Sequence, residues 1–173
     1  SFVLTILLSP IMLVIAIAIK AEDGGPVFFR QERVTTYGRV FRIFKFRTMI
    51  VDADKKGPLV TGKKDNRITK VGGKLRHLRL DELPQVLNIL TGDMSFVGTR
   101  PEVKKYVDQY TDEMQATLLL PAGVTSLASI AFKEEDELIA KYTARGEGTD
   151  EAYMKHILPK KMKYNLDYLR KAG

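Results

Sequence analysis

The sequence predicts an α+β fold in which an apolar N-terminal helix precedes a small, mostly helical domain with a short β-hairpin. Three observations support this prediction: an uncharged apolar segment at the N-terminus, two strand-like runs joined by turn residues, and helical spacing of apolar side chains through most of the remaining chain. Because 45% of the 173 residues are hydrophobic, the chain can bury one core. Nothing in the sequence indicates an internal repeat or a second globular domain.

Apolar residues fill positions 2–19, interrupted only by Thr5, Ser9 and Pro10. The length approaches the roughly 20 residues that a membrane-spanning helix needs. Pro10 removes a hydrogen bond from the middle of the helix, and the Ser9 hydroxyl could bond the freed carbonyl. A kinked spanning helix and a helix that bends here and returns to the side it entered are both compatible with this pattern. A signal peptide is disfavoured because no small-residue cleavage site precedes Lys20.

Basic residues are concentrated in the first half of the chain. Residues 20–80 hold 16 Lys and Arg against 6 Asp and Glu, whereas residues 81–173 hold 12 against 15. A basic region after an apolar segment is attracted to anionic lipid, by about 1 kcal/mol for each charge near the surface. It is equally attracted to a diphosphate substrate or a nucleic acid, but no nucleic-acid-binding signature accompanies it, so we expect no nucleic-acid partner. The absence of cysteine excludes disulfides and thiolate metal sites.

Two strands at residues 27–29 and 40–46 are predicted to pair as a hairpin through a turn at 35–38. In the second strand, Lys45 and Arg47 alternate with phenylalanines, so one face is expected to be basic and the other apolar. The two cations on this basic face are therefore candidate phosphate-binding residues.

The rest of the chain is predicted to be mainly helical. Helices are expected at residues 70–78, 81–90, 103–119, 134–142 and 153–169. Residues 52–70 are polar and rich in Gly, Pro and Lys, and predict a mobile loop, whereas residues 92–101 predict a strand and turn. The tyrosines of the last helix recur at helical spacing, which is more typical of core packing, although tyrosine and lysine together also suit a membrane interface.

The residues best suited to chemistry are concentrated at positions 76–85, where arginines lead directly into the paired carboxylates Asp81 and Glu82. Pro84 has no backbone N–H and is tolerated only in the first turn of a helix, so a helix is predicted to start near Asp81. The dipole at a helix N-terminus favours anions and is expected to hold Asp81 ionised. The alternative is an N-capping acid with a solvated neighbour.

Other motifs are weaker. Four arginines carry the forked donors that suit bidentate phosphate contacts, although each could equally be a solvated surface charge. They are Arg47, Arg76, Arg79 and Arg100. The Asp-Ala-Asp triplet at residues 52–54 is similar to a metal-binding Asp-x-Asp motif, but three residues are a weak signal. His77 and His156 lack zinc-site spacing, and no ATP-binding P-loop occurs.

Four motifs nevertheless follow one another in a fixed order. They are FFRQER at residues 28–33, FKFRTM at 44–49, LDELPQ at 80–85 and GDMSFVGTRP at 92–101. Together they resemble the bacterial sugar transferase family, the monotopic polyprenyl-phosphate phosphoglycosyl transferases, and the resemblance runs over essentially the whole chain. It implies that residues 1–20 form a re-entrant membrane helix bent at Ser9-Pro10, with both ends on the cytosolic side. Residues 21–173 would form a cytosolic catalytic domain.

The resemblance also implies a site. In such enzymes the first residue of an Asp-Glu dyad is the nucleophile, which here is Asp81. The dyad requires Mg²⁺, for which Glu82 is the first expected ligand and Asp81 a second. Arg76 and Arg100 match arginines that serve phosphate groups.

The implied reaction transfers a phosphosugar from a nucleotide diphosphate-sugar, expected to be linked to UDP, to polyprenyl (undecaprenyl) phosphate. It passes through an aspartyl phosphosugar and releases UMP, as the first membrane step of surface glycan assembly. The expected location is the cytosolic face of the bacterial inner membrane, in contact with membrane lipids, and an oligomer is compatible with the sequence. A non-catalytic membrane-surface scaffold of the same fold is the alternative, and a nucleotide-sugar hydrolase is a third hypothesis.

Two positions depart from the family pattern. Thr99 replaces the first proline of the usual Gly-Pro-Arg-Pro, and Asn165 stands where many members have aspartate. A role for that carboxylate is therefore not expected here. Because residue 1 is Ser rather than Met, and the family continues beyond residue 173, we expect further sequence at both ends.

Overall fold

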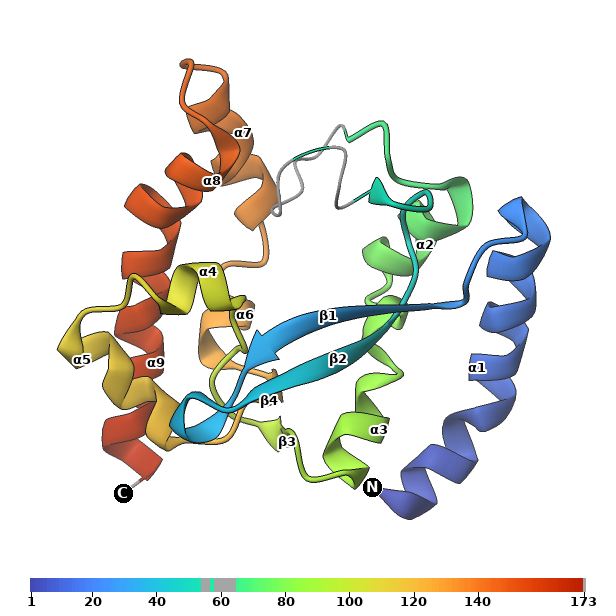
Figure 1. The fold of residues 1–173 in the computed structure, drawn as a ribbon, viewed down its shortest axis with the longest axis horizontal. Coiled ribbons are helices and arrows are strands. Elements are labelled where there is room, and N and C mark those ends of the chain that lie inside the picture. The colour runs from blue at the N-terminus through green and yellow to red at the C-terminus, as the bar shows by residue number, and fades with distance from the viewer. Residues whose placement is uncertain (54–56, 58–64, 173) are drawn as a thin grey trace.

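The computed structural model describes residues 1–53, 57 and 65–172. In these residues the fold consists of helices and two small sheets, which confirms the mixed α and β composition predicted from the sequence. Figure 1 shows the first helix along one side of the molecule, the hairpin of residues 28–46 across the middle, and the last helices on the opposite side. The predicted loop at 52–70 and the triplet at 52–54 lie partly outside the described residues.

Helix α1 (Phe2–Asp23) is continuous through Pro10. The Ser9 hydroxyl donates to the carbonyl of Ile6 at 2.7 Å, which is the carbonyl that the missing N–H of Pro10 leaves free. The expected local role of Ser9 is therefore confirmed. Within the described chain, α1 is the one helix long and apolar enough to cross a membrane by length and composition. Its re-entrant course stays a prediction.

The predicted hairpin is confirmed and is longer than expected. Strand β1 (Phe28–Val34) pairs antiparallel with β2 (Val40–Phe46), and a short turn, η1 (Thr36–Gly38), joins them. Both faces of β2 are covered. Phe41 and Ile43 are buried on one face, and Phe46 is buried on the other beside α1.

The prediction of one basic and one apolar face is therefore wrong for this strand. Lys45 shares the face of Phe41 and Ile43, because the chain packs apolar residues against both sides of the hairpin.

Helix α2 (Lys70–His77) begins at the predicted position, where the Thr69 hydroxyl accepts a hydrogen bond from the N–H of Gly72 at 3.0 Å. A Cβ added at Gly72 would lie 2.1 Å from the carbonyl oxygen of Thr48. Glycine at this position therefore lets α2 lie directly against the chain that leaves β2. This contact sets the distance between the hairpin and the segment that carries the Asp-Glu pair.

The helix predicted to start near Asp81 is divided. A single-turn 3₁₀ helix, η3 (Leu80–Glu82), precedes α3 (Gln85–Leu90). Asn88 on α3 accepts a hydrogen bond from the N–H of Phe44 at 2.8 Å and donates to the carbonyl of Arg42 at 3.0 Å. These two bonds satisfy the open edge of β2 and fix α3 beside it.

The second sheet is small and parallel. Strand β3 (Ser95–Val97), which confirms the predicted strand, pairs with β4 (Gly123–Thr125). The predicted helix at 103–119 is wrong in its continuity, because the Thr111 hydroxyl accepts from the N–H of Met114 and starts a new helix. The chain there forms α4 (Lys104–Val107), α5 (Asp112–Gln115) and η4 (Ala116–Leu119).

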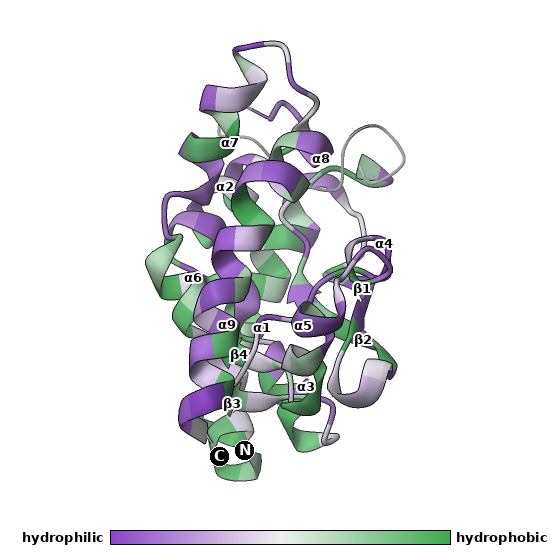
Figure 2. Ribbon diagram, turned by 90° about the vertical axis from the view of Figure 1, so that its left-hand side faces the viewer, coloured by the Kyte–Doolittle hydropathy of each residue, from purple (hydrophilic) through white to green (hydrophobic). Residues whose placement is uncertain are grey.

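The C-terminal half has its own core. Its elements are α6 (Leu127–Ala131), α7 (Glu135–Thr143), α8 (Thr149–Ala152), η5 (Tyr153–Ile157) and α9 (Leu158–Ala172). Figure 2 shows hydrophilic and hydrophobic segments alternating along α9, as in a helix with one buried face. Tyr153 and Ile157 are buried in this core, so the core-packing interpretation is confirmed for the first tyrosine of the stripe, whereas Tyr164 is exposed.

Candidate active site

Three segments bring opposite charges together beside α3. Lys45 comes from β2, Glu82 from η3 and Arg100 from the loop after β3. The Nζ of Lys45 lies 3.0 Å from Oε1 of Glu82, and Nη2 of Arg100 lies 3.4 Å from the same oxygen. All three side chains are largely buried, with 18%, 13% and 26% of their surface exposed. One carboxylate oxygen therefore holds two cations at a site that solvent still reaches.

The electrostatics of Glu82 follow from this arrangement. Burial alone would raise the pKa of its carboxyl, but the charges of Lys45 and Arg100 outweigh burial and lower the pKa to about 2. The pKa of Lys45 lies below its usual value because burial outweighs the attraction of Glu82, and Arg100 adds repulsion. The site therefore contains an ionised carboxylate and more positive charge than that carboxylate balances.

Asp81 differs from its neighbour. It is buried, and its Oδ1 atom has no hydrogen-bond partner among the described residues. Burial raises its pKa, Lys45 and Arg76 oppose the rise, and Glu82 adds to it. The helix dipole expected to favour the anion is not the main influence on Asp81, because η3 is a single turn with little dipole and burial raises the pKa.

The two arginines before the dyad occupy different positions. Arg76, at the end of α2, donates from Nε to the hydroxyl of Thr48 at 3.1 Å, and its charge acts on Asp81. Arg79 adopts a left-handed conformation (φ 58°, ψ 20°), which costs a non-glycine residue roughly 1 kcal/mol. This turn ends α2 and redirects the chain into η3.

Arg47 is not brought to this cluster. Its guanidinium donates to the carboxylate of Asp23 at 2.6 Å and to the carbonyls of Pro26 and Met49 at 2.6 and 2.9 Å. The side chain is buried and connects the end of α1 to the chain beside the hairpin, so its charge is used in a structural contact.

Sequence reasoning missed a buried polar network next to Arg100. The Nζ of Lys161 lies 3.0 Å from Glu135 and 3.4 Å from Glu102. The Tyr153 hydroxyl donates to Glu102 at 2.6 Å, and Arg33 donates to the carbonyl of Pro101 at 3.1 Å. These contacts fix the backbone that follows Arg100. In the sequence, this network is indicated only by Lys161, a lysine among the apolar and aromatic residues of one helical face.

A groove of about 490 Å³ opens beside the charged cluster. Arg79, Glu82, Arg100 and Lys133 contribute to its lining. The other side chains are mainly apolar and include Leu4, Leu8, Val86, Ile89, Phe96 and Ile130. The groove therefore joins the charged cluster to the first turns of α1.

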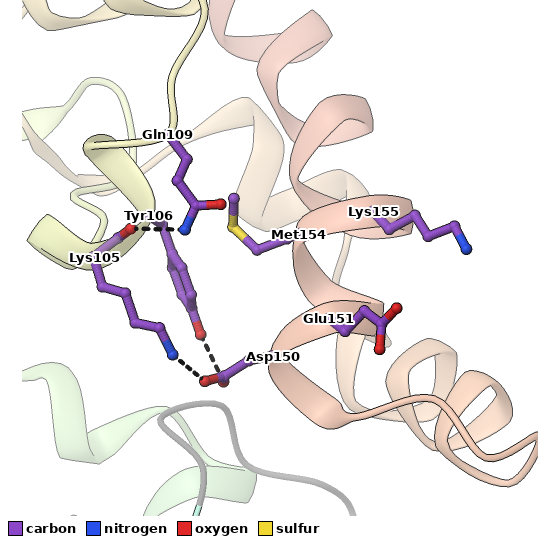
Figure 3. Close-up of a pocket in the computed structure, with 7 residues that line it drawn as sticks. All are labelled: Lys105, Tyr106, Gln109, Asp150, Glu151, Met154 and Lys155. Carbon is purple, nitrogen blue, oxygen red and sulfur yellow. Dashed lines mark hydrogen bonds and ion pairs between the residues drawn. The ribbon is translucent and has the colours of Figure 1, made fainter.

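A second cavity, of about 460 Å³, lies between α4 and α8, and no residue of the charged cluster lines it. Figure 3 shows its lining, in which Lys105 and the Tyr106 hydroxyl both bond to Asp150, at 2.7 and 2.9 Å.

Asn165, the other departure from the family pattern, is buried within α9, where its amide contacts the sulfur of Met162 at 3.8 Å.

The protein side chains near the dyad offer two carboxylates as ligands for a divalent cation. Among the described residues, no group of three or more His, Cys, Asp or Glu side chains is placed to hold a metal ion. Asp81 and Glu82 supply two carboxylates, and Oδ1 of Asp81 is unbonded. This matches Mg²⁺, which typically takes one or two carboxylates and completes its shell with phosphate oxygens and water.

Comparison with known proteins identifies the family of this chain. A protein family described as "Bacterial sugar transferase" matches residues 1–172. A UDP-glucose:undecaprenyl-phosphate glucose-1-phosphate transferase of Klebsiella pneumoniae is 41% identical over 151 residues, which is 85% of this chain and 32% of that protein. A protein of the same name from Xanthomonas campestris pv. campestris is 39% identical over 168 residues, 94% of this chain and 31% of the relative.

A UDP-N-acetylgalactosamine-undecaprenyl-phosphate N-acetylgalactosaminephosphotransferase of Aeromonas hydrophila is 48% identical over 108 residues, 62% of this chain and 26% of that protein. The chain thus spans about a third or less of these relatives. With the family match extending over nearly every residue, the chain belongs to the bacterial sugar transferase family.

Proposed function

We propose that this chain transfers a phosphosugar from a UDP-sugar to undecaprenyl phosphate and releases UMP. The observation that carries the proposal is the position of Glu82, the neighbour of Asp81, which contacts two cations and lines an apolar groove that reaches α1. The relatives' names, which contain UDP-sugars and undecaprenyl phosphate, support the same substrates.

Asp81 is the proposed nucleophile. An oxygen of its carboxylate attacks the phosphorus that bears the sugar, the bond from that phosphorus to the oxygen of UMP breaks, and UMP leaves with the bonding electrons. An oxygen of the lipid phosphate then attacks the phosphorus of the aspartyl phosphosugar, and the carboxylate of Asp81 leaves. One phosphoanhydride is consumed and another is formed, so the overall exchange is close to thermoneutral.

The cations stabilise the charge on the transferred phosphoryl group. Lys45 and Arg100 are held in place by Glu82 before the donor binds, and such preorganised charges lower a barrier without reorganisation during the reaction. Arg76 acts from the side of Asp81. A Mg²⁺ held by Glu82 and Asp81 would add further neutralisation of phosphate charge.

The proposed location is the cytosolic face of the bacterial inner membrane, with residues 1–20 re-entrant. The large exposed apolar side chains of α1 support a lipid environment for it. They include Phe2, Val3, Ile6, Leu7 and Leu13.

Purified protein in nanodiscs tests the function through UMP release from UDP-glucose and UDP-N-acetylgalactosamine, with and without undecaprenyl phosphate. The proposal expects sustained turnover only with the lipid. No UMP from any donor would support a non-catalytic scaffold, and sustained turnover without lipid would support a hydrolase.

A further inference from the structure

The lining of the groove beside the charged cluster combines two kinds of chemistry. Three cations, Arg79, Arg100 and Lys133, line it together with one carboxylate, that of Glu82. The rest of the lining is mainly apolar and comes from separate elements, including Leu8 on α1 and Ile130 on α6. A molecule that fills the groove must therefore combine an anionic head with an apolar chain.

Several apolar side chains that line the groove are exposed, which is unfavourable in water. Ile130 is 64% exposed, Phe96 48% and Leu4 37%. Removing apolar surface from water is favourable, so an apolar ligand that covers these side chains gains affinity. Two side chains of α1, Leu4 and Leu8, line the groove, and their neighbours Val3 and Leu7 are exposed, so apolar surface extends from the groove onto this helix.

We propose that this groove binds the polyprenyl phosphate acceptor, with the phosphate at Arg79, Arg100 and Lys133 and the first isoprene units between Leu8 and Ile130. This proposal rests on the proposed function and adds the residues that select the acceptor. The volume of about 490 Å³ falls within the roughly 300–1,000 Å³ of small-ligand sites. It therefore holds the head and the first units of the chain, and the remaining units extend along α1 into lipid.

The polar part of the lining is suited to the head of this ligand. Three cations against one carboxylate leave net positive charge, which complements a phosphate monoester. Arg100 is also linked to the wall of the groove, since its Nη1 lies 3.4 Å from the hydroxyl of Ser129 on α6. Because Arg100 contacts Glu82 as well, a phosphate bound there lies next to the dyad.

A charge placed in the apolar wall separates acceptor binding from donor binding. Ile130→Glu should raise the KM for undecaprenyl phosphate at least tenfold, since one apolar group in a fitted site is commonly worth 10-fold or more. The KM for the UDP-sugar should change less than twofold. Leu119→Glu is the matched control, because Leu119 is similarly exposed at 57% and does not line the groove; its KM values should stay at those of the parent protein.

Fluorescence gives a readout that needs no turnover. The chain contains no tryptophan, so Phe96→Trp places a single fluorophore in the groove wall and Leu119→Trp places one outside it. Adding undecaprenyl phosphate to the protein in nanodiscs should shift the emission of the first variant to shorter wavelength and leave that of the second unchanged. UDP-glucose should shift neither.

Several results would overturn the proposal. These are an unchanged acceptor KM in Ile130→Glu, an equal rise in the donor KM, an equal effect of Leu119→Glu, or emission from Phe96→Trp that does not respond to undecaprenyl phosphate. The last result would show that this lipid does not occupy the groove. If lipid binding is seen but no UDP-sugar reacts, the proposed function fails while the groove assignment stands.

Discussion

Neutralising the two adjacent carboxylates should change stability in opposite directions. Glu82→Gln removes an ionised group that holds two largely buried cations, whereas Asp81→Asn removes a buried carboxyl with an unbonded oxygen. The first substitution should destabilise the fold at pH 7 and the second should stabilise it. Both should abolish or strongly reduce transfer.

The magnitude for Glu82 follows from its pKa. A fall from the ordinary 4.5 to about 2 corresponds to about 3 kcal/mol, at about 1.4 kcal/mol for each pH unit. For a domain of this size, that predicts a decrease in Tm of roughly 6–12 °C. Because the folded-state pKa is depressed, this stabilisation is complete above pH 4.5 and is lost as the pH falls through about 2. The difference between parent and variant should therefore shrink below pH 4.5.

The sign for Asp81 is the reverse. Its pKa is raised in the folded state, so the ionised carboxylate opposes folding above that pKa, and a neutral amide of the same shape removes the cost. Thermal unfolding followed by circular dichroism in one detergent, at pH 7 and pH 4, measures both variants against the parent. An unchanged Tm in Glu82→Gln, or a lower Tm in Asp81→Asn, would refute the electrostatic reasoning.

Two further predictions concern the supports of the site. Lys161→Met leaves Glu102 and Glu135 without the cation between them and should lower the free energy of unfolding by about 3–5 kcal/mol. Denaturant unfolding measures this difference, and a decrease below about 1 kcal/mol would show that the network contributes little to stability. Pro10→Ala restores the hydrogen bond to the Ile6 carbonyl and should favour a spanning α1. A cysteine placed before residue 1 should then become accessible from outside the cell while activity falls, and labelling is clear because the chain has no native cysteine. Outside labelling already present with Pro10 would contradict the re-entrant course.

Local features of the fold could be predicted from the sequence. Proline at position 10 required a replacement donor for one carbonyl, and Ser9 supplies it. Turn residues between two strand-like runs predicted the hairpin. The Asp81-Glu82 pair could also be selected as a candidate site from its motif, because the two carboxylates and the arginines before them are neighbours in the sequence; its catalytic role stays a prediction.

Features that depend on distant contacts could not be predicted. The burial that raises the pKa of Asp81 comes from packing around η3 rather than from local sequence. Arg47 was a candidate phosphate ligand in the sequence, but its guanidinium pairs with Asp23, a residue 24 positions away. Lys45 of β2 was expected on a basic face of the hairpin. Its partly buried contact with Glu82 depends on tertiary packing, which the local sequence does not show.

The proposed covalent bond between Asp81 and the phosphosugar can be detected by intact-mass spectrometry. The protein is incubated with Mg²⁺ and UDP-glucose or UDP-N-acetylgalactosamine, without lipid acceptor. We expect the parent to gain the mass of one phosphosugar and to release one equivalent of UMP. Added undecaprenyl phosphate should remove the adduct, and Asp81→Asn should gain none. An adduct of the same mass on folded Asp81→Asn, or lipid product formed by that variant at the parent rate, would contradict the proposed bond to Asp81.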